Sequence, residues 1–232
     1  MKPSRARLYI DGFNFYYAVK KFCDGAKLHL GWCDFSELFH NHLAPGTELV
    51  EIKYFTARVE RRDLEIEEDE RARQELWLRA TTTIPKLTLI EGFYQGRSSR
   101  ASGHPLGLRN HEKCRDCPFK EKKRVEKQTD VNIAVHMIRD AALYHDYDQA
   151  ILISEDQDLR PAATAVAEWP TRKMHSSVWF PLGDLPLPKP KQLNPCIEYH
   201  RITEEMLATS RLPDIIPTPA GPIECLDIWK KH

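Results

Sequence analysis

Short apolar segments alternate along the chain with longer segments whose apolar residues recur at helical spacing. The strand-like segments are short, apolar and rich in β-branched or aromatic residues: Arg7–Ile10, Glu48–Val59, Lys86–Gln95, Ala150–Ile153 and Val178–Leu182. The helix-like segments are Phe13–Phe22, Phe35–His42, Thr129–Tyr144 and Leu159–Trp169. This alternation predicts an α/β fold of three layers, in which helices cover both faces of a mainly parallel sheet.

Two helices have clear boundary signals. Thr129 can cap the helix that follows it, and Pro161 fits only the first turn of its helix. The segment Arg61–Ala80 is charged along most of its length, which is typical of a helix with a solvated face.

The segment Gly96–Val125 has neither helical nor strand period, and we interpret it as an inserted loop or small subdomain. We therefore expect one domain over residues 1–182, with a basic insert at about 96–127. Residues 183–232 form a proline-rich C-terminal extension with one short helix near Glu204–Thr209.

Aspartates lie at the ends of three of the predicted elements, where we expect the edge of the sheet. Asp11 ends the first strand, Asp130 opens the central helix, and Asp156 and Asp158 follow the strand Ala150–Ile153. Ligands of open parallel sheets bind outside the carboxyl ends of the strands, so we expect these side chains to converge. Each aspartate alone is also explained as a cap or turn residue.

Converging carboxylates repel one another, and a hard divalent cation offsets that cost. A donor set of oxygens alone favours Mg²⁺ or Mn²⁺ over zinc. Such a site suits hydrolysis of phosphodiester bonds by a metal-activated water, which needs no covalent nucleophile.

Overall charge is balanced, with 34 basic and 34 acidic residues. The segment Arg97–Lys127 nevertheless holds ten Lys and Arg against four Asp and Glu, so it is a candidate contact for a phosphate backbone or, alternatively, a solvated loop. No apolar run approaches the roughly 20 residues that span a bilayer. We expect a cytoplasmic protein with no membrane contact and with nucleic acid, RNA above all, as its partner.

Cys114 and Cys117 have the spacing of a zinc knuckle, and His104 and His111 are close enough in sequence to complete four ligands. A structural Zn²⁺ and free thiols are the alternatives. Phe15, Tyr16 and Tyr17 are expected in the core, although an exposed member could stack on a base.

The ordered motifs resemble those of the NYN-domain family of PIN-like nucleases, in its LabA-like branch. They are Asp11-Gly12-Phe13-Asn14, the segment Glu126–Val131, Asp140-Ala141 and the segment Ser154–Pro161. The resemblance spans about residues 7–182. It implies a Rossmann-like, three-layer PIN-like fold and Mg²⁺- or Mn²⁺-dependent cleavage, usually of RNA.

By motif, the resemblance makes Asp11, Asp130, Asp156 and Asp158 the metal ligands, and Asn14 a residue that holds the first ligand or the substrate. Glu155 stands where the family often has glycine. Its carboxylate is expected to face solvent rather than to tune the metal.

The leading hypothesis is therefore a metal-dependent ribonuclease, most simply an endoribonuclease. The alternative is a non-catalytic, regulatory RNA-binding module that retains the fold. A phosphatase of the haloacid-dehalogenase type is disfavoured, because Phe13 occupies the position where that chemistry needs a second aspartate. The sequence leaves open the natural substrate, RNA against DNA, endo- against exonucleolytic cleavage, and whether the chain forms a homo-oligomer.

Overall fold

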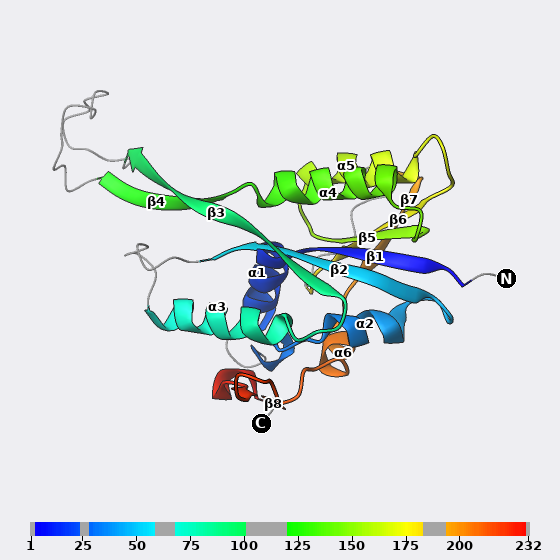
Figure 1. The fold of residues 1–232 in the computed structure, drawn as a ribbon. Coiled ribbons are helices and arrows are strands. Elements are labelled where there is room, and N and C mark those ends of the chain that lie inside the picture. Colours follow the sequence, from blue (N-terminus) through cyan, green and yellow to red (C-terminus); the bar gives the residue numbers. More distant parts are fainter. Residues whose placement is uncertain (1–2, 24–27, 59–67, 101–119, 183–193, 231–232) are drawn as a thin grey trace.

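The chain forms a seven-stranded sheet with helices on both faces, as a computed structural model describes it for residues 3–23, 28–58, 68–100, 120–182 and 194–230 (Figure 1). The strand order is β4-β3-β2-β1-β5-β6-β7. The strands are β1 (Arg5–Asp11), β2 (Glu48–Ala57), β3 (Leu87–Arg100), β4 (Lys120–Lys127), β5 (Gln149–Ile153), β6 (His175–Phe180) and β7 (Ile197–Arg201). All neighbouring strands pair in parallel except β3 and β4.

The helices divide between the two faces of the sheet (Figure 1). One face is covered by α1 (Gly12–Cys23), α2 (Phe35–His42), α3 (Glu68–Thr81) and α6 (Glu204–Ala208). The other face is covered by α4 (Thr129–Leu143) and α5 (Arg160–Ala167). Short 3₁₀ turns at Leu28–Gly31, Gln157–Leu159 and Asp227–Trp229 and a small hairpin of β8 (Ile215–Ile216) and β9 (Ile223–Glu224) complete the described elements.

The order of the six parallel strands matches that of a Rossmann-like α/β fold. The predicted α/β fold class and mainly parallel sheet are therefore confirmed. In this topology the chain leaves β1 in one direction along the sheet and returns to β5 on its other side. Ligands of such folds bind at this switch point, beyond the carboxyl ends of β1 and β5.

Strand β1 supplies both halves of the core, because successive side chains point to opposite faces. Ala6, Leu8 and Ile10 belong to the apolar cluster beneath α1, α2 and α3. Tyr9 belongs to a second cluster, where Ile133 and Met137 of α4 pack against the sheet. Asp11 lies two residues beyond Tyr9, at the end of the strand.

Three expectations from the sequence are corrected here. Part of the segment 96–125 is strand rather than loop, since β3 runs to Arg100 and pairs antiparallel with β4. Thr129 is not the cap of α4: Gln128 is, with a left-handed φ of 75°. The predicted strands end with Val178–Leu182, but a further strand, β7, follows in the chain and pairs with β6.

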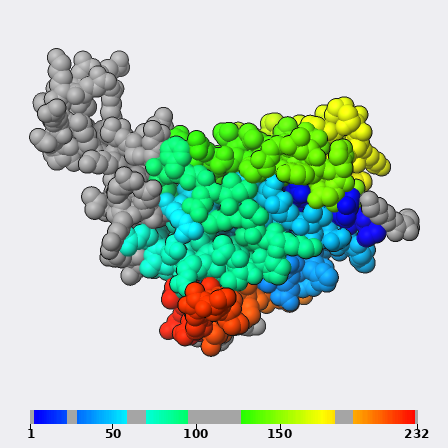
Figure 2. Space-filling view, in the orientation of Figure 1, coloured from blue at the N-terminus to red at the C-terminus, as the bar shows by residue number. Residues whose placement is uncertain are grey.

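Residues beyond 182 contribute to the same core as the rest of the sheet. Leu212, Ile216, Ile223 and Trp229 are buried in the cluster under α1 and α3, where the Trp229 ring stacks on Trp32 at 5.3 Å between centroids. Figure 2 shows the C-terminal segment, in orange and red, packed against the part of the surface that belongs to α3. The predicted short helix is present as α6.

A buried ionic cluster joins α4 to the middle of the sheet. The Asp140 carboxylate is fully buried, accepts a hydrogen bond from the Tyr9 hydroxyl at 3.1 Å, and pairs with Arg7 at 3.4 Å and with Lys53. Burial raises the pKa of the Tyr9 phenol well above its usual value, and the nearby Tyr147 and Asp140 raise it further. Tyr9 is therefore a neutral donor to Asp140 at physiological pH.

None of the described helices is long and apolar enough to cross a membrane.

We predict that Asp140→Ala destabilises the fold by roughly 3–5 kcal/mol, because it leaves two buried cations without their shared carboxylate. Urea unfolding followed by circular dichroism measures the loss. Asp227→Ala is the control, since its ion pair with Lys230 is exposed, and it should leave the midpoint unchanged. Equal effects of the two substitutions would contradict the prediction.

Candidate functional site

The side chain that ends β1 is a buried carboxylate held from two sides. Asp11 is 4% exposed. One oxygen accepts the backbone N–H of Asn14 at 3.0 Å, and the other accepts the hydroxyl of Ser154 at 3.0 Å. Since Ser154 follows β5, the second bond joins the two strands at the switch point. The position of the Asp11 carboxylate is thus fixed by the fold.

The loop after β5 is tied to the first turn of α1 by a second bond. The Asn14 amide oxygen accepts the backbone N–H of Glu155 at 2.8 Å. Within the loop, the Ser154 hydroxyl accepts the N–H of Asp156 at 3.0 Å, and the Asp156 carboxylate accepts the N–H of Asp158 at 2.8 Å. Asn14 therefore holds the acidic loop in place as well as facing the site.

These residues surround an open pocket of about 400 Å³ beyond the ends of β1 and β5. The structure brings four of the five predicted site residues to its lining: Asp11, Asn14, Asp130 and Asp156. Asp158 is exposed and is not among the lining residues. Asp156 also caps the 3₁₀ turn at Gln157–Leu159, so the capping role and the placement at the site hold together for this residue.

Helix α1 adds a basic residue that the sequence analysis did not select. Asn14, Ala18 and Lys21 are spaced by four and three residues, so they share one side of α1 and all line the pocket. Helical spacing from Asn14 is the signal that could have identified Lys21. The pocket therefore has a cation at its rim that can pair with a phosphate.

Glu155 does not simply face solvent, which corrects the expectation for this position. It lines the pocket, and its carboxylate pairs with Arg201 at the end of β7, at 3.1 Å. Arg201 also donates to the carbonyl oxygen of Pro181. The ion pair partly neutralises Glu155.

Gly12 permits the sharp passage from β1 into α1. A Cβ at this position would lie 2.6 Å from the backbone oxygen of Phe55 and 2.6 Å from the Tyr54 ring. The close approach keeps Asn14 within reach of both Asp11 and the loop after β5.

The side chains in this pocket that could ligate a metal are of the type that a hard cation prefers. They are carboxylate and amide oxygens, without Cys or His. Among the described residues, no group of three or more His, Cys, Asp or Glu side chains is placed so that it could hold a metal ion. Mg²⁺ commonly binds through one or two carboxylates, keeps several waters, and shares substrate phosphates, so a pair such as Asp11 and Asp156 fits this sparser mode.

Two predicted features fall outside the described residues. Cys114 and Cys117, with His104 and His111, lie between residues 101 and 119. Most of the basic insert lies there too, and for β4 the structure describes the backbone of Lys120–Lys127. A zinc site and an RNA contact on the insert stay predictions.

Comparison with known proteins gives a distant relationship. No family model matches the chain. The 6-hydroxy-3-succinoylpyridine 3-monooxygenase HspA of Pseudomonas putida is 31% identical over 185 residues, a match that covers 69% of this chain and 55% of that protein. The chain thus spans about half the length of this relative. A crystal structure of a Vibrio parahaemolyticus protein of unknown function aligns at 16% identity, with a TM-score of 0.46, over 91% of this chain and 98% of that chain.

We predict that Ser154→Ala destabilises the fold by about 1–3 kcal/mol, because the buried Asp11 carboxylate loses a donor and the N–H of Asp156 loses an acceptor. Ser176→Ala is a matched control on the same sheet. The Ser176 hydroxyl is also buried but makes no hydrogen bond to any described residue, so its removal should be neutral or slightly stabilising. Chemical unfolding of both variants tests the difference, and equal stabilities would refute it.

Proposed function

We propose that this chain is a metal-dependent ribonuclease with a PIN-like active site at the switch point of its sheet. The reaction is hydrolysis of a phosphodiester bond by water. The chain's basic segment and the motif resemblance favour RNA, and we propose internal cleavage of a single strand.

One observation carries this proposal. Asp11, Asn14, Asp130 and Asp156 come from three separate parts of the chain, yet they line one open pocket. Local capping applies to Asp156 and also to Asp11, whose carboxylate accepts the N–H of Asn14 at the start of α1. Capping within each segment does not explain why these two side chains and Asp130 line the same pocket. An acidic pocket where Rossmann-like folds bind ligands is best explained by cation-assisted chemistry on a phosphate.

The residues of the chain have separable roles in this mechanism. Asp11 and Asp156 would hold Mg²⁺ or Mn²⁺ together with water and a substrate phosphate, and Asp130 lines the same pocket. The ion when bound lowers the pKa of water and stabilises negative charge on phosphate oxygens. Ser154 and the N–H of Asn14 orient the Asp11 carboxylate. Lys21 is placed to pair with a phosphate of the strand, and Asn14 keeps the loop after β5 against α1.

A non-catalytic RNA-binding module is the alternative within the same fold. In such a module the basic segment would bind RNA, and no divalent ion would be required. Salt-dependent RNA binding without divalent binding by calorimetry would favour it over the nuclease.

A second candidate function is oxygenation of a heteroaromatic compound. The name of the Pseudomonas putida relative describes such an activity on 6-hydroxy-3-succinoylpyridine. The observation in its favour is an aromatic cavity between α1 and α3, lined by Tyr16, Tyr54 and Trp77 among others, which shares Phe13 and Tyr17 with the acidic pocket. Incubation with that compound, dioxygen and NADH as reductant, followed by chromatography, tests this function: consumption of the compound supports it, and its full recovery contradicts it.

For the ribonuclease, we predict that purified protein cleaves a labelled single-stranded RNA in Mn²⁺ or Mg²⁺ and stops in EDTA. Asp11→Asn and Asp156→Asn should each lower the rate at least about 100-fold, because each replaces a carboxylate ligand of the cation with a neutral amide. Asp158→Asn should cost less, because its side chain does not line the pocket. Gel analysis of cleavage products gives the rates.

Glu198→Gln is the control for these variants, because its exposed carboxylate pairs only with His200 in the described structure and lies on β7. It should cleave as fast as the unchanged chain. Cleavage that persists in EDTA, or that survives Asp11→Asn and Asp156→Asn in folded protein, would reject the mechanism.

A further inference from the structure

We propose that the aromatic cavity between α1 and α3 binds a nucleobase of the strand whose phosphate occupies the acidic pocket. This inference rests on the proposed ribonuclease function and adds a base subsite to it. The cavity is distinct from the acidic pocket but shares two aromatic side chains with it, Phe13 and Tyr17.

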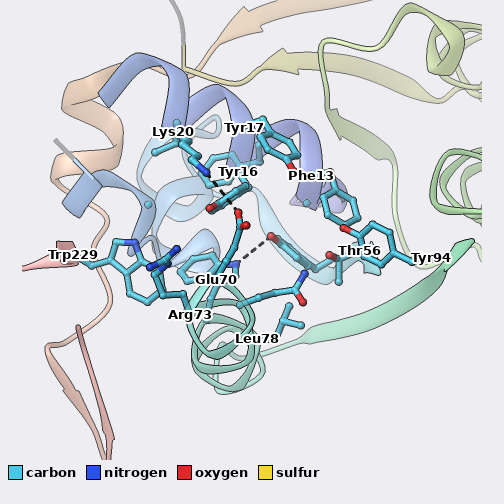
Figure 3. Close-up of a pocket in the computed structure, with 17 residues that line it drawn as sticks. Phe13, Tyr16, Tyr17, Lys20, Thr56, Glu70, Arg73, Leu78, Tyr94 and Trp229 are labelled. Atoms are coloured by element: carbon cyan, nitrogen blue, oxygen red, sulfur yellow. Dashed lines mark hydrogen bonds and ion pairs between the residues drawn. The ribbon is translucent and has the colours of Figure 1, made fainter. Parts of the chain in front are cut away.

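The cavity lies between two helices and the sheet, and eight of the 17 residues that line it are aromatic (Figure 3). Phe15, Tyr54 and Trp77 are buried side chains that contribute to it, and a hydrogen bond of 3.1 Å from the Trp77 indole to the Tyr54 hydroxyl fixes two of them. Tyr94 of β3 stands at one end and Trp229 at the other. These rings offer flat apolar surfaces to a planar ligand.

Helical spacing on α1 connects the cavity with the acidic pocket. Tyr16 and Lys20 line the cavity, Asn14, Ala18 and Lys21 line the acidic pocket, and Phe13 and Tyr17 line both. The Phe13 and Tyr17 rings are nearly parallel, at 20°, with centroids 6.4 Å apart. Tyr17 is also 56% exposed. A nucleic-acid strand with a phosphate in the acidic pocket would therefore have a neighbouring base beside the exposed ring of Tyr17.

The size of the cavity suits one ring system. Its volume is about 180 Å³, below the roughly 300–1,000 Å³ of pockets that hold drug-sized ligands. A base alone is thus a better match than a whole nucleotide, whose sugar and phosphate would remain outside with the rest of the strand.

Polar groups at the rim match the edge of a base and the adjoining backbone. Lys20 pairs with Glu70 at 3.5 Å across the opening, and Arg73 lies beside them (Figure 3). Burial raises the pKa of the Tyr17 phenol, and Glu70 and Tyr16 raise it further, so Tyr17 keeps its proton for donation. Stacking gives a base affinity without strict sequence preference.

The test compares a fluorescein-labelled oligouridylate with an abasic strand of the same length and charge, by anisotropy in EDTA so that the strand stays intact. The unchanged protein should bind the oligouridylate more tightly. Tyr17→Ala should weaken that binding about 5- to 150-fold, as expected for one lost stack, and leave abasic binding unchanged. Tyr17→Phe should retain the preference.

Tyr144→Ala is the matched control, since Tyr144 is an exposed tyrosine at the far end of α4, and it should retain the preference too. Thermal melting checks that each variant is folded. Equal or undetectable binding of the two strands by the unchanged protein, or a preference that survives Tyr17→Ala, overturns the base subsite.

The base subsite and the ribonuclease fail separately. Asp156→Asn should abolish cleavage yet keep the preference for the oligouridylate. If the unchanged protein prefers the oligouridylate but does not cleave RNA, the ribonuclease proposal fails and the base subsite stands. If it cleaves RNA but shows no preference, the base subsite fails and the ribonuclease proposal stands.

Discussion

The hydrogen bond from Ser154 to Asp11 is the contact on which the candidate site depends. It joins the ends of β1 and β5, where the chain changes direction along the sheet, and it fixes a carboxylate that is almost wholly buried. The bond from the N–H of Glu155 to Asn14 ties the same loop to α1. Because both bonds span the switch point, any shift between β1 and β5 would move the acidic side chains relative to one another.

Carboxylates at the two ends of α4 have different surroundings. Near one end of α4, Asp140 pairs with Arg7 and Lys53 and accepts a hydrogen bond from the Tyr9 hydroxyl, so these contacts join the helix to the sheet. At the other end, Asp130 lines the same pocket as Asp11 and Asp156, and Lys21 is the basic residue among the described residues that line it. A buried carboxylate needs compensation in either place. Asp140 is compensated by buried cations, whereas Asp11 receives neutral donors, the Ser154 hydroxyl and the Asn14 N–H, and lines an open pocket.

The sequence predicted the elements with strong local signals and failed where pairing between distant segments decides. Strand β1, helix α4 and the turn at Pro161 follow from local pattern, and so does the gathering of Asp11, Asp130 and Asp156. The charged β4 lacks apolar alternation, and β7 alternates only briefly, at Ile197 and Tyr199. These two segments are strands through their pairing with β3 and β6. The ion pair of Glu155 with Arg201 requires β7, so the local pattern did not predict it either. Asp158 resembles Asp156 in sequence, but the turn directs only one of them to the pocket.

Helix α1 gives the two pockets a common rigid wall. Its start is fixed by the close approach of Gly12 to Phe55 and Tyr54, and Phe15 packs against Phe35 with centroids 5.0 Å apart. Rotation of this helix would displace Asn14 from the loop after β5 and Tyr17 from the aromatic cavity together. A ligand that spans both pockets therefore meets groups whose relative positions are set before it binds, which limits the entropy lost on binding. Such preorganisation suits a strand held at once by a phosphate and by a base.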